Sequence, residues 1–262
     1  MLDLRRRDGR PLVVGHRGAP RLAPENTLAA FAAAVELGVD MVELDVLALR
    51  SGPLVVAHSD RLEEITHGAA SGPVGARTLD ELRSLAPGLP TLDEALAWFA
   101  SAAPAVALHV DLKLRDRVEE VADALERSGL AGRAVVSSVH GADLARVRAR
   151  SAGALVALTY PHDRLGIGGR PLLRPAVRAV LAGARRAAPV RLPALVRRAG
   201  ADALMLQHAL VSRALVARVH QLGLPVLAWT VDEPAEMARV IEAGVDGVIT
   251  NEPGCLLATL AT

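Results

Sequence analysis

The sequence has few aromatic residues, one cysteine and one lysine. Phenylalanine, tryptophan and tyrosine together make up 2% of the 262 residues, which argues against stacking platforms for single-stranded nucleic acid. The lone Cys255 excludes an internal disulfide and suits a reducing compartment. The other basic residues are all arginine, so the single ammonium side chain, Lys113, is a candidate for a specific role.

A long apolar run and a strong charge imbalance are missing as well. The basic residues Arg5, Arg6 and Arg7 precede Asp8 and not an apolar stretch, so the pattern predicts neither a signal peptide nor a spanning helix. We therefore expect a cytoplasmic protein. The net charge of +1 implies no polyanionic partner, and we expect no binding to nucleic acid. With 51% hydrophobic residues, the chain can form a substantial core.

Short apolar runs alternate with segments of helical period along the whole chain. The runs are continuous and not alternating, as is typical of parallel strands that are buried on both faces. We expect strands at 12–15, 41–47, 106–112, 134–139, 155–160, 203–207, 226–230 and 247–250. Helices are expected between them, among others at 27–37, 117–128, 142–150, 212–222 and 234–243. Eight such β/α units predict a TIM (β/α)8 barrel, a single domain over residues 11–262, with an open doubly wound sheet as the alternative.

Two segments interrupt this alternation. Residues 59–104 are rich in Gly, Pro and Thr and predict a small insertion after the hairpin of the second strand, with a helix over 92–100. Residues 161–198 mix Arg with Leu, Ala and Pro. They fit a pair of exposed helices, or a cationic and apolar lid that makes a peripheral contact with a membrane.

The stretch 41–60 contains the first group of candidate site residues. Glu43 and Asp45 stand at alternate positions of an apolar strand, so their side chains point to the same side. Two neighbouring buried carboxylates repel each other unless a cation lies between them. The chain turns at 51–53 and returns through an apolar run to His58, which brings an imidazole back to the same neighbourhood.

Further candidates follow the first and third predicted barrel strands. His16 and Arg17 follow the first strand, and a guanidinium is suited to binding a phosphate or carboxylate. Glu25 follows eight residues after Arg17. It is a candidate for the site, and the alternative is that it only stabilises the start of the helix that follows. In the third barrel strand the same alternation puts His109, Asp111 and Lys113 on one face.

The chemistry of this set predicts a metal site with an anionic substrate. Asp111 adds a third carboxylate, and oxygen ligands favour Mg²⁺ or Ca²⁺ over zinc. Lys113 can hold a phosphate oxygen, although a buried pair with Asp111 is the alternative, and Trp229 is expected to line the site. Two histidines can act as general base and general acid. The residues therefore indicate metal-assisted cleavage of a phosphate ester.

The order of these motifs resembles the glycerophosphodiester phosphodiesterase family. The resemblance runs from about residue 16 to 253 and rests on HRGAP, PENTLAAF, VELDV, RSGPLVVAH, DLK, VVSSV and VLAWTVDEPAEMARVIEAGVDGVITNEP. It implies a TIM barrel with a small insertion, a divalent metal, and hydrolysis of small glycerophosphodiesters to glycerol phosphate and an alcohol.

The resemblance also implies roles for individual residues. His16 and His58 would be the acid/base pair, Arg17 and Lys113 would hold the phosphate, and Glu43, Asp45 and Asp111 would bind the metal, with Glu25 completing the metal site or its surroundings. The sequence departs from the family pattern at Leu49 and Ser51, where the family has a threonine and an aspartate, in the length of the segment 161–198, and at two further positions. Ser59 stands where the family has an aspartate, and Asp111 stands where it usually has a glutamate.

Two alternatives to glycerophosphodiester hydrolysis follow from these departures and from residues 161–198. A lid over that segment would suit a phosphodiesterase acting on lysophospholipids or another lipid-derived diester. The changes at Ser59 and Asp111 would suit a catalytically weak barrel that binds phosphodiesters. The sequence does not decide the oligomeric state.

Overall fold

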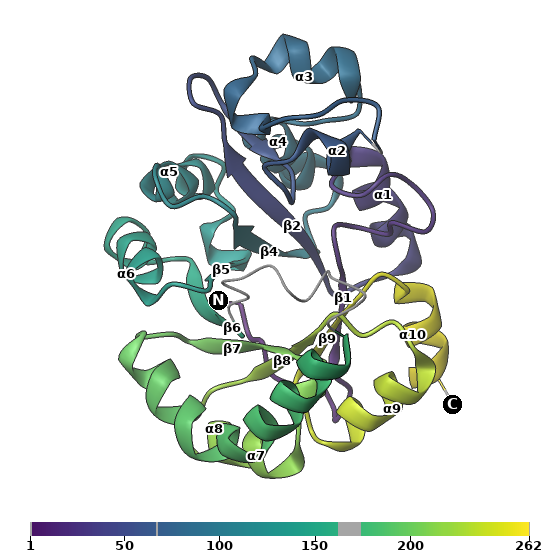
Figure 1. Ribbon diagram of the computed structural model, residues 1–262, viewed down its shortest axis with the longest axis vertical. Coiled ribbons are helices and arrows are strands. Elements are labelled where there is room, and N and C mark those ends of the chain that lie inside the picture. The colour runs from purple at the N-terminus through teal and green to yellow at the C-terminus, as the bar shows by residue number, and fades with distance from the viewer. Residues whose placement is uncertain (1, 67, 162–173, 262) are drawn as a thin grey trace.

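In the computed structural model, which describes residues 2–66, 68–161 and 174–261, eight parallel strands form a closed barrel (Figure 1). The barrel closes because β1 pairs with β2 on one side and with β9 on the other. All eight expected strands are confirmed, and the doubly wound sheet is excluded. They are β1 (Leu12–Gly15), β2 (Met41–Ala48), β4 (Ala107–Leu112), β5 (Ala134–Ser138), β6 (Leu155–Tyr160), β7 (Ala203–Gln207), β8 (Val226–Trp229) and β9 (Gly247–Thr250).

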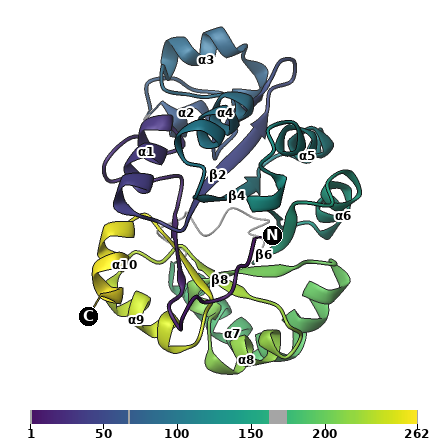
Figure 2. The same ribbon diagram turned by 180° about the vertical axis from the view of Figure 1, so that it is seen from behind.

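Helices follow the strands and surround the barrel (Figures 1 and 2). Thr27 begins α1 by accepting a hydrogen bond from the backbone N–H of Ala30, and Gly38 ends it with a φ of 86°. Thr91 and Glu94 form a capping box at α4. The outer helices are α1 (Leu28–Leu37), α4 (Leu92–Ala102), α5 (Val118–Arg127), α6 (Gly141–Arg150), α7 (Arg174–Arg198), α8 (Arg213–His220), α9 (Pro234–Glu242) and α10 (Pro253–Leu260), with 3₁₀ turns at Ala131–Arg133 and His208–Leu210.

Alternate residues of each strand fill the inside of the barrel. The inward side chains form one buried cluster that excludes water from the lower part of the barrel. Leu4, 2% exposed, belongs to this cluster, so the segment before residue 11 contributes to the barrel as well. The other buried members are Leu12, Val14, Met41, Ala107, Val135, Ala157, Ala203, Met205, Leu227 and Ile249.

An insertion lies between the hairpin strand β3 (Leu54–Val56) and α4, at the top of Figure 1. β3 pairs antiparallel with β2, as expected for the hairpin. The insertion contains α2 (Leu62–Ile65), a 3₁₀ turn at Val74–Ala76 and α3 (Leu79–Leu85). It covers one face of the hairpin with a small core of its own: Leu47, Leu49, Val55, Ala57, Leu62, Val74, Leu82 and Leu89.

The described part of the Arg-rich segment 161–198 forms one helix, α7, where the sequence suggested a pair of exposed helices; residues 162–173 lie outside the described residues. Its C-terminal half packs against α8 through the buried side chains of Ala188, Leu192 and Val196. Among the helices of the described residues, none is both long enough and apolar enough to cross a membrane.

Candidate active site

The strands' C-terminal ends surround a cavity of about 120 Å³. The same alternation that fills the barrel continues upward into this cavity, so that His16 follows Leu12 and Val14, and Asp45 follows Met41 and Glu43. Of the predicted site residues, His16, Arg17, Glu43, Asp45, His58, Asp111, Lys113 and Trp229 line it. Glu25 lies beside it and binds Arg17.

The turn after β1 gives the site its shape. Arg17 and Asn26 have φ values of 55° and 57°, in the left-handed region that non-glycine residues rarely adopt. Gly18 packs so closely on α1 that a Cβ there would meet the backbone carbonyl carbon of Ala30 at 2.5 Å. In this turn the N–H of Arg17 donates to Glu43 Oε2 at 2.8 Å, which fixes that carboxylate.

Three carboxylates form a group that could hold a metal ion. Oxygen atoms of Glu43, Asp45 and Asp111 lie within 4.8 Å of one another. Burial, together with the charge of Asp45, raises the pKa of Glu43 well above its ordinary value. A divalent cation would relieve this repulsion, and an all-oxygen ligand set suits a hard cation. The three residues therefore fit the metal that the resemblance implies, whereas Glu25 is not part of the group.

Two cations border the carboxylates. Lys113 Nζ donates to Asp111 Oδ2 and lies 3.2 Å from Asp45 Oδ1. Burial alone would lower the pKa of Lys113, but these two carboxylates raise it above its ordinary value. Burial would raise the pKa of Asp45, but Lys113 and Arg17 hold it below its ordinary value. The Arg17 guanidinium binds Glu25 through Nη1 at 2.8 Å and lies 3.1 Å from Asp45 through Nε.

His16 is held in one tautomer by two residues that we did not predict. The side-chain amide of Asn251 donates to Asp232 Oδ2 at 2.8 Å, so its oxygen accepts from His16 Nδ1–H at 2.7 Å. Nε2 then carries the lone pair, and it lies 4.0 Å from Glu43. Burial, then the charge of Arg17, lowers the pKa of His16 to about 4, so the ring is neutral at pH 7.

His58 occupies the opposite position at the end of the hairpin. Its side chain is 37% exposed, and Nδ1 lies 3.9 Å from the carboxylate of Glu64 on α2. Burial lowers the pKa of His58. The two histidines therefore differ in surroundings, since His16 is enclosed by the barrel and His58 faces the insertion.

Several buried polar atoms at the cavity have no hydrogen-bond partner. Ser137 donates its hydroxyl to Asp111, so it accepts from His109 Nε2–H and leaves His109 Nδ1 as an unpaired acceptor. Thr159 Oγ1 and Trp229 Nε1 are likewise buried without a hydrogen bond. Because buried polar groups are normally satisfied, this part of the cavity is built for a polar ligand.

Ser59, next to His58, differs from the family pattern. Both Ser59 and the following Asp60 form hydrogen bonds with neighbouring backbone groups. Ser59 accepts a hydrogen bond from the N–H of Arg61 at 3.2 Å. Asp60 accepts one from the N–H of Gly75 at 2.7 Å and so joins two segments within the insertion. Neither residue belongs to the carboxylate group.

One of the missed residues had a signal in the sequence. Asn251 follows Ile249 by two positions, so it continues the inward face of β9 in the same way as His16 continues that of β1. Asp232 lies in the loop after β8, where strand alternation no longer applies. Its role could be recognised only from the hydrogen bonds to Thr250 and Asn251.

A closed (β/α)8 barrel with three carboxylates, two cations and two histidines at the C-terminal ends of its strands defines a class of phosphate-ester enzymes. Comparison with known proteins identifies the family within this class. Residues 16–255 match the model of the glycerophosphoryl diester phosphodiesterase family, and the chain belongs to this family.

Individual relatives agree over nearly the whole chain. A glycerophosphodiester phosphodiesterase of Caldanaerobacter subterraneus is 29% identical, with 94% of this chain and 96% of the relative covered. A crystal structure from Silicibacter pomeroyi matches with a TM-score of 0.80 at 27% identity, covering 98% and 95%. An Oleispira antarctica phosphodiesterase, solved in complex with the product sn-glycerol-3-phosphate, matches with 0.71 at 21%, covering 96% and 97%. The protein is thus a hydrolase of phosphoric diesters.

Proposed function

We propose that this protein hydrolyses glycerophosphodiesters to glycerol phosphate and an alcohol, with a divalent metal and with His16 and His58 as the acid/base pair. One observation carries the proposal. The carboxylates of Glu43, Asp45 and Asp111, the cations of Arg17 and Lys113 and both histidines line one cavity. The Oleispira antarctica relative holds sn-glycerol-3-phosphate, which is the product that we expect here.

Glu43, Asp45 and Asp111 would hold the metal, for which Mg²⁺ and Ca²⁺ are the candidates. Glu25 is the further carboxylate that we predicted for the metal site, and its bond to Arg17 connects it to the site. When bound, the metal neutralises phosphate charge and favours attack at phosphorus.

The cations and the unpaired polar atoms would bind the substrate. Arg17 and Lys113 face the phosphate, where charge accumulates during the reaction. Trp229 Nε1 is a buried donor without a hydrogen-bond partner, and His109 Nδ1 is a buried acceptor without one. Together they suit phosphate oxygens and the hydroxyl groups of glycerol.

The surroundings of the histidines suggest a role for each. His16 Nε2, with its lone pair free, takes the proton from the glycerol hydroxyl beside the phosphoester, and that oxygen attacks phosphorus. The bond from phosphorus to the other alcohol breaks, and His58 gives its proton to the leaving oxygen. A water molecule, deprotonated by His58, then opens the cyclic phosphate, and His16 returns its proton to the glycerol oxygen.

The direct test is release of glycerol phosphate from glycerophosphocholine, with and without a chelator, by the wild type and His16→Ala. We expect loss of about 10²–10⁴-fold in kcat for the variant, since one acid/base group is gone. We also expect inactivation by the chelator and recovery with Mg²⁺ or Ca²⁺.

His220→Ala is a suitable control, because His220 binds Asp246 at 2.7 Å before the start of β9, at the opposite end of the barrel. It should remain active if folded. Turnover that survives both the chelator and the loss of His16 contradicts the proposed mechanism. A folded, metal-bound protein that binds the diester without cleaving it would instead support a binding barrel.

A further inference from the structure

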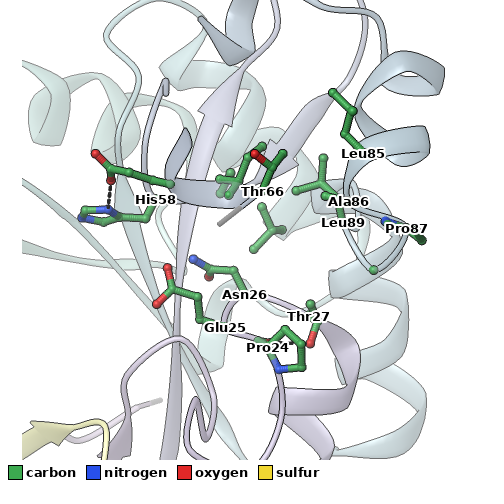
Figure 3. A pocket seen from close by; sticks show the side chains of 15 residues that line it. Pro24, Glu25, Asn26, Thr27, His58, Thr66, Leu85, Ala86, Pro87 and Leu89 are labelled. Carbon is green, nitrogen blue, oxygen red and sulfur yellow. Dashed lines mark hydrogen bonds and ion pairs between the residues drawn. The ribbon is translucent and has the colours of Figure 1, made fainter. Parts of the chain in front are cut away.

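A second cavity, of about 260 Å³, lies between the barrel and the insertion (Figure 3). Figure 3 shows the turn after α3 on one side and the loop before α1 on the other, with His58 at one end. Four segments line it: residues 24–27, 56–58, 64–66 and 85–89. Three of the four belong to the hairpin or the insertion.

This cavity lies next to the catalytic one. His58 lines both. Glu25 lines the second cavity and binds Arg17, which lines the first. A group that is bonded to phosphorus and receives its proton from His58 would therefore extend into the second cavity.

The walls of the second cavity are mostly apolar. Val56 is fully buried, Leu89 is 7% exposed, and Ile65, Ala86 and Pro87 complete the surface. Leu85, the last residue of α3, is 40% exposed and adds a partly exposed apolar side chain to the wall. An alkyl chain in contact with the partly exposed Ile65, Leu85 and Pro87 would cover apolar area that is otherwise in water.

The amide and hydroxyl side chains of this lining, those of Asn26, Thr27 and Thr66, already have hydrogen-bond partners. Thr27 Oγ1 donates to the carbonyl of Pro24 and accepts from Ala30 N–H. Thr66 Oγ1 donates to the carbonyl of Leu62 and accepts from Ala70 N–H. The amide of Asn26 exchanges two hydrogen bonds with Asp45.

The two cavities therefore differ in what they can bind. The catalytic cavity has buried donors and acceptors without hydrogen-bond partners at His109, Thr159 and Trp229. A polyol fits there, and it would find few partners in the second cavity. A hydrocarbon fits the second cavity, because it displaces no hydrogen bond.

We propose that the cavity beneath the insertion binds the hydrocarbon of the leaving alcohol, so that the preferred substrates are glycerol phosphodiesters of alcohols with an alkyl chain. This inference rests on the proposed function and specifies its substrate class. The volume is sufficient, since a cavity of about 150 Å³ already holds a benzene molecule. The rim carboxylates Glu25 and Glu64 face Arg17 and His58, so a cationic head group is the weaker alternative.

The test is a series of glycerol phosphodiesters in which the other alcohol is methanol, butanol, hexanol or choline. We expect kcat/KM to rise about threefold to fourfold per methylene until the cavity is filled, since each buried methylene contributes about 0.8 kcal/mol. The kcat/KM for the hexyl ester should be higher than that for the choline ester.

Two variants tie the effect to the cavity. Leu85→Ser removes an apolar wall and should lower the hexyl-to-methyl ratio of kcat/KM several-fold. Ala86→Phe fills the space and should abolish the dependence on chain length. Leu195→Ser is the matched control, because Leu195 is 43% exposed but lies on α7, and it should keep the wild-type ratio.

The outcomes separate the two proposals. If the methyl and hexyl esters are cleaved equally well, the cavity assignment is wrong and the proposed function stands. If the choline ester is preferred over the hexyl ester, the cavity serves a cationic head group and the assignment is again wrong. If no diester is cleaved with metal present, both proposals fail.

Discussion

At the scale of single residues, the unpredicted pair of Asn251 and Asp232 decides what His16 can do. Asp232 accepts from both the backbone and the side chain of Asn251, so the Asn251 amide cannot rotate without losing a bond. Its oxygen therefore stays toward His16 Nδ1. A histidine held in this way keeps Nε2 available as a proton acceptor.

Asn251→Ala should lower kcat by about 10²-fold with little change in KM, because the substrate contacts remain while the tautomer of His16 is no longer fixed. Steady-state kinetics measures the split between kcat and KM. Long-range ¹⁵N–¹H NMR of the ring should show a mixture of tautomers in the variant and one tautomer in the wild type.

Asn251→Gln provides the comparison, since it keeps the amide and should recover part of the activity. If Asn251→Ala changes only the melting temperature, or if KM rises with kcat unchanged, then Asn251 is a structural residue and does not position His16.

His109 gives a prediction about pH and stability. Burial lowers its pKa to about 4, whereas an unfolded chain has a histidine pKa of about 6.5. As the pH falls below about 6.5, the unfolded state takes up a proton that the folded state does not, so the free energy of unfolding decreases until about pH 4. The contribution of His109 reaches about 3 kcal/mol.

Urea unfolding of the metal-free protein at pH 7.5 and 4.5 measures this decrease. In His109→Gln the decrease should be smaller than in the wild type by about 2 kcal/mol, although the variant also starts from a different stability at pH 7.5. An equal decrease in both proteins would mean that His109 does not contribute to the pH dependence.

At the scale of secondary-structure elements, strand alternation explains how much of the site could be predicted. Glu43, Asp45 and Asp111 were found because each lies on a strand whose inward face can be counted from the sequence. Features that depend on loops could not be found in this way. The bond from Asp232 to Asn251 and the lining of the second cavity each join segments that are distant in sequence.

Sequence periodicity was also insufficient to predict how the helices and the N-terminal segment pack. Helical period predicted where α1, α5 and α9 lie, but it could not show that one face of α7 would be buried. Leu4 enters the barrel floor from a segment that has no regular period, so no pattern placed it in the core.

We still predict a peripheral membrane contact through the exposed face of α7. Val190 is 80% and Leu195 43% exposed, and exposed arginines stand around them at 185, 186, 191, 197 and 198. Apolar side chains among arginines suit an anionic lipid surface. Vesicles with anionic lipid should therefore co-sediment the protein at low salt, and Val190→Asp should weaken this binding.

Leu22→Asp is the control for that experiment, because Leu22 is 64% exposed but lies in the loop after β1. Equal binding of both variants and the wild type would leave α7 without a membrane role. If the protein binds neutral vesicles as strongly as anionic ones, the arginines of α7 do not contribute to membrane binding.

At the scale of the whole molecule, the metal site that we propose at the three carboxylates would couple metal binding to stability. In the metal-free protein they repel one another inside the barrel, as the raised pKa of Glu43 indicates. An ion that binds only the folded state stabilises it by about 2.7 kcal/mol at a concentration 100 times Kd. For a chain of this length we expect the melting temperature to rise by about 5–10 °C.

Thermal melts with Mg²⁺, with Ca²⁺ and with chelator measure this shift and show which ion is preferred. Asp111→Asn should reduce the shift, because it removes one charge from the ligand group. A melting temperature that does not respond to either ion would contradict a metal site formed by Glu43, Asp45 and Asp111.

The pairing of β1 with β9 has a consequence for the synthesis of the protein. His16 is made 235 residues before the Asn251 that orients it, and the strand β9 beside it is made equally late. Until the last strand leaves the ribosome, the first has no partner on that side and the imidazole is not oriented. An interrupted chain would therefore be inert, and competence for hydrolysis would arise only when the final β/α unit has joined the barrel.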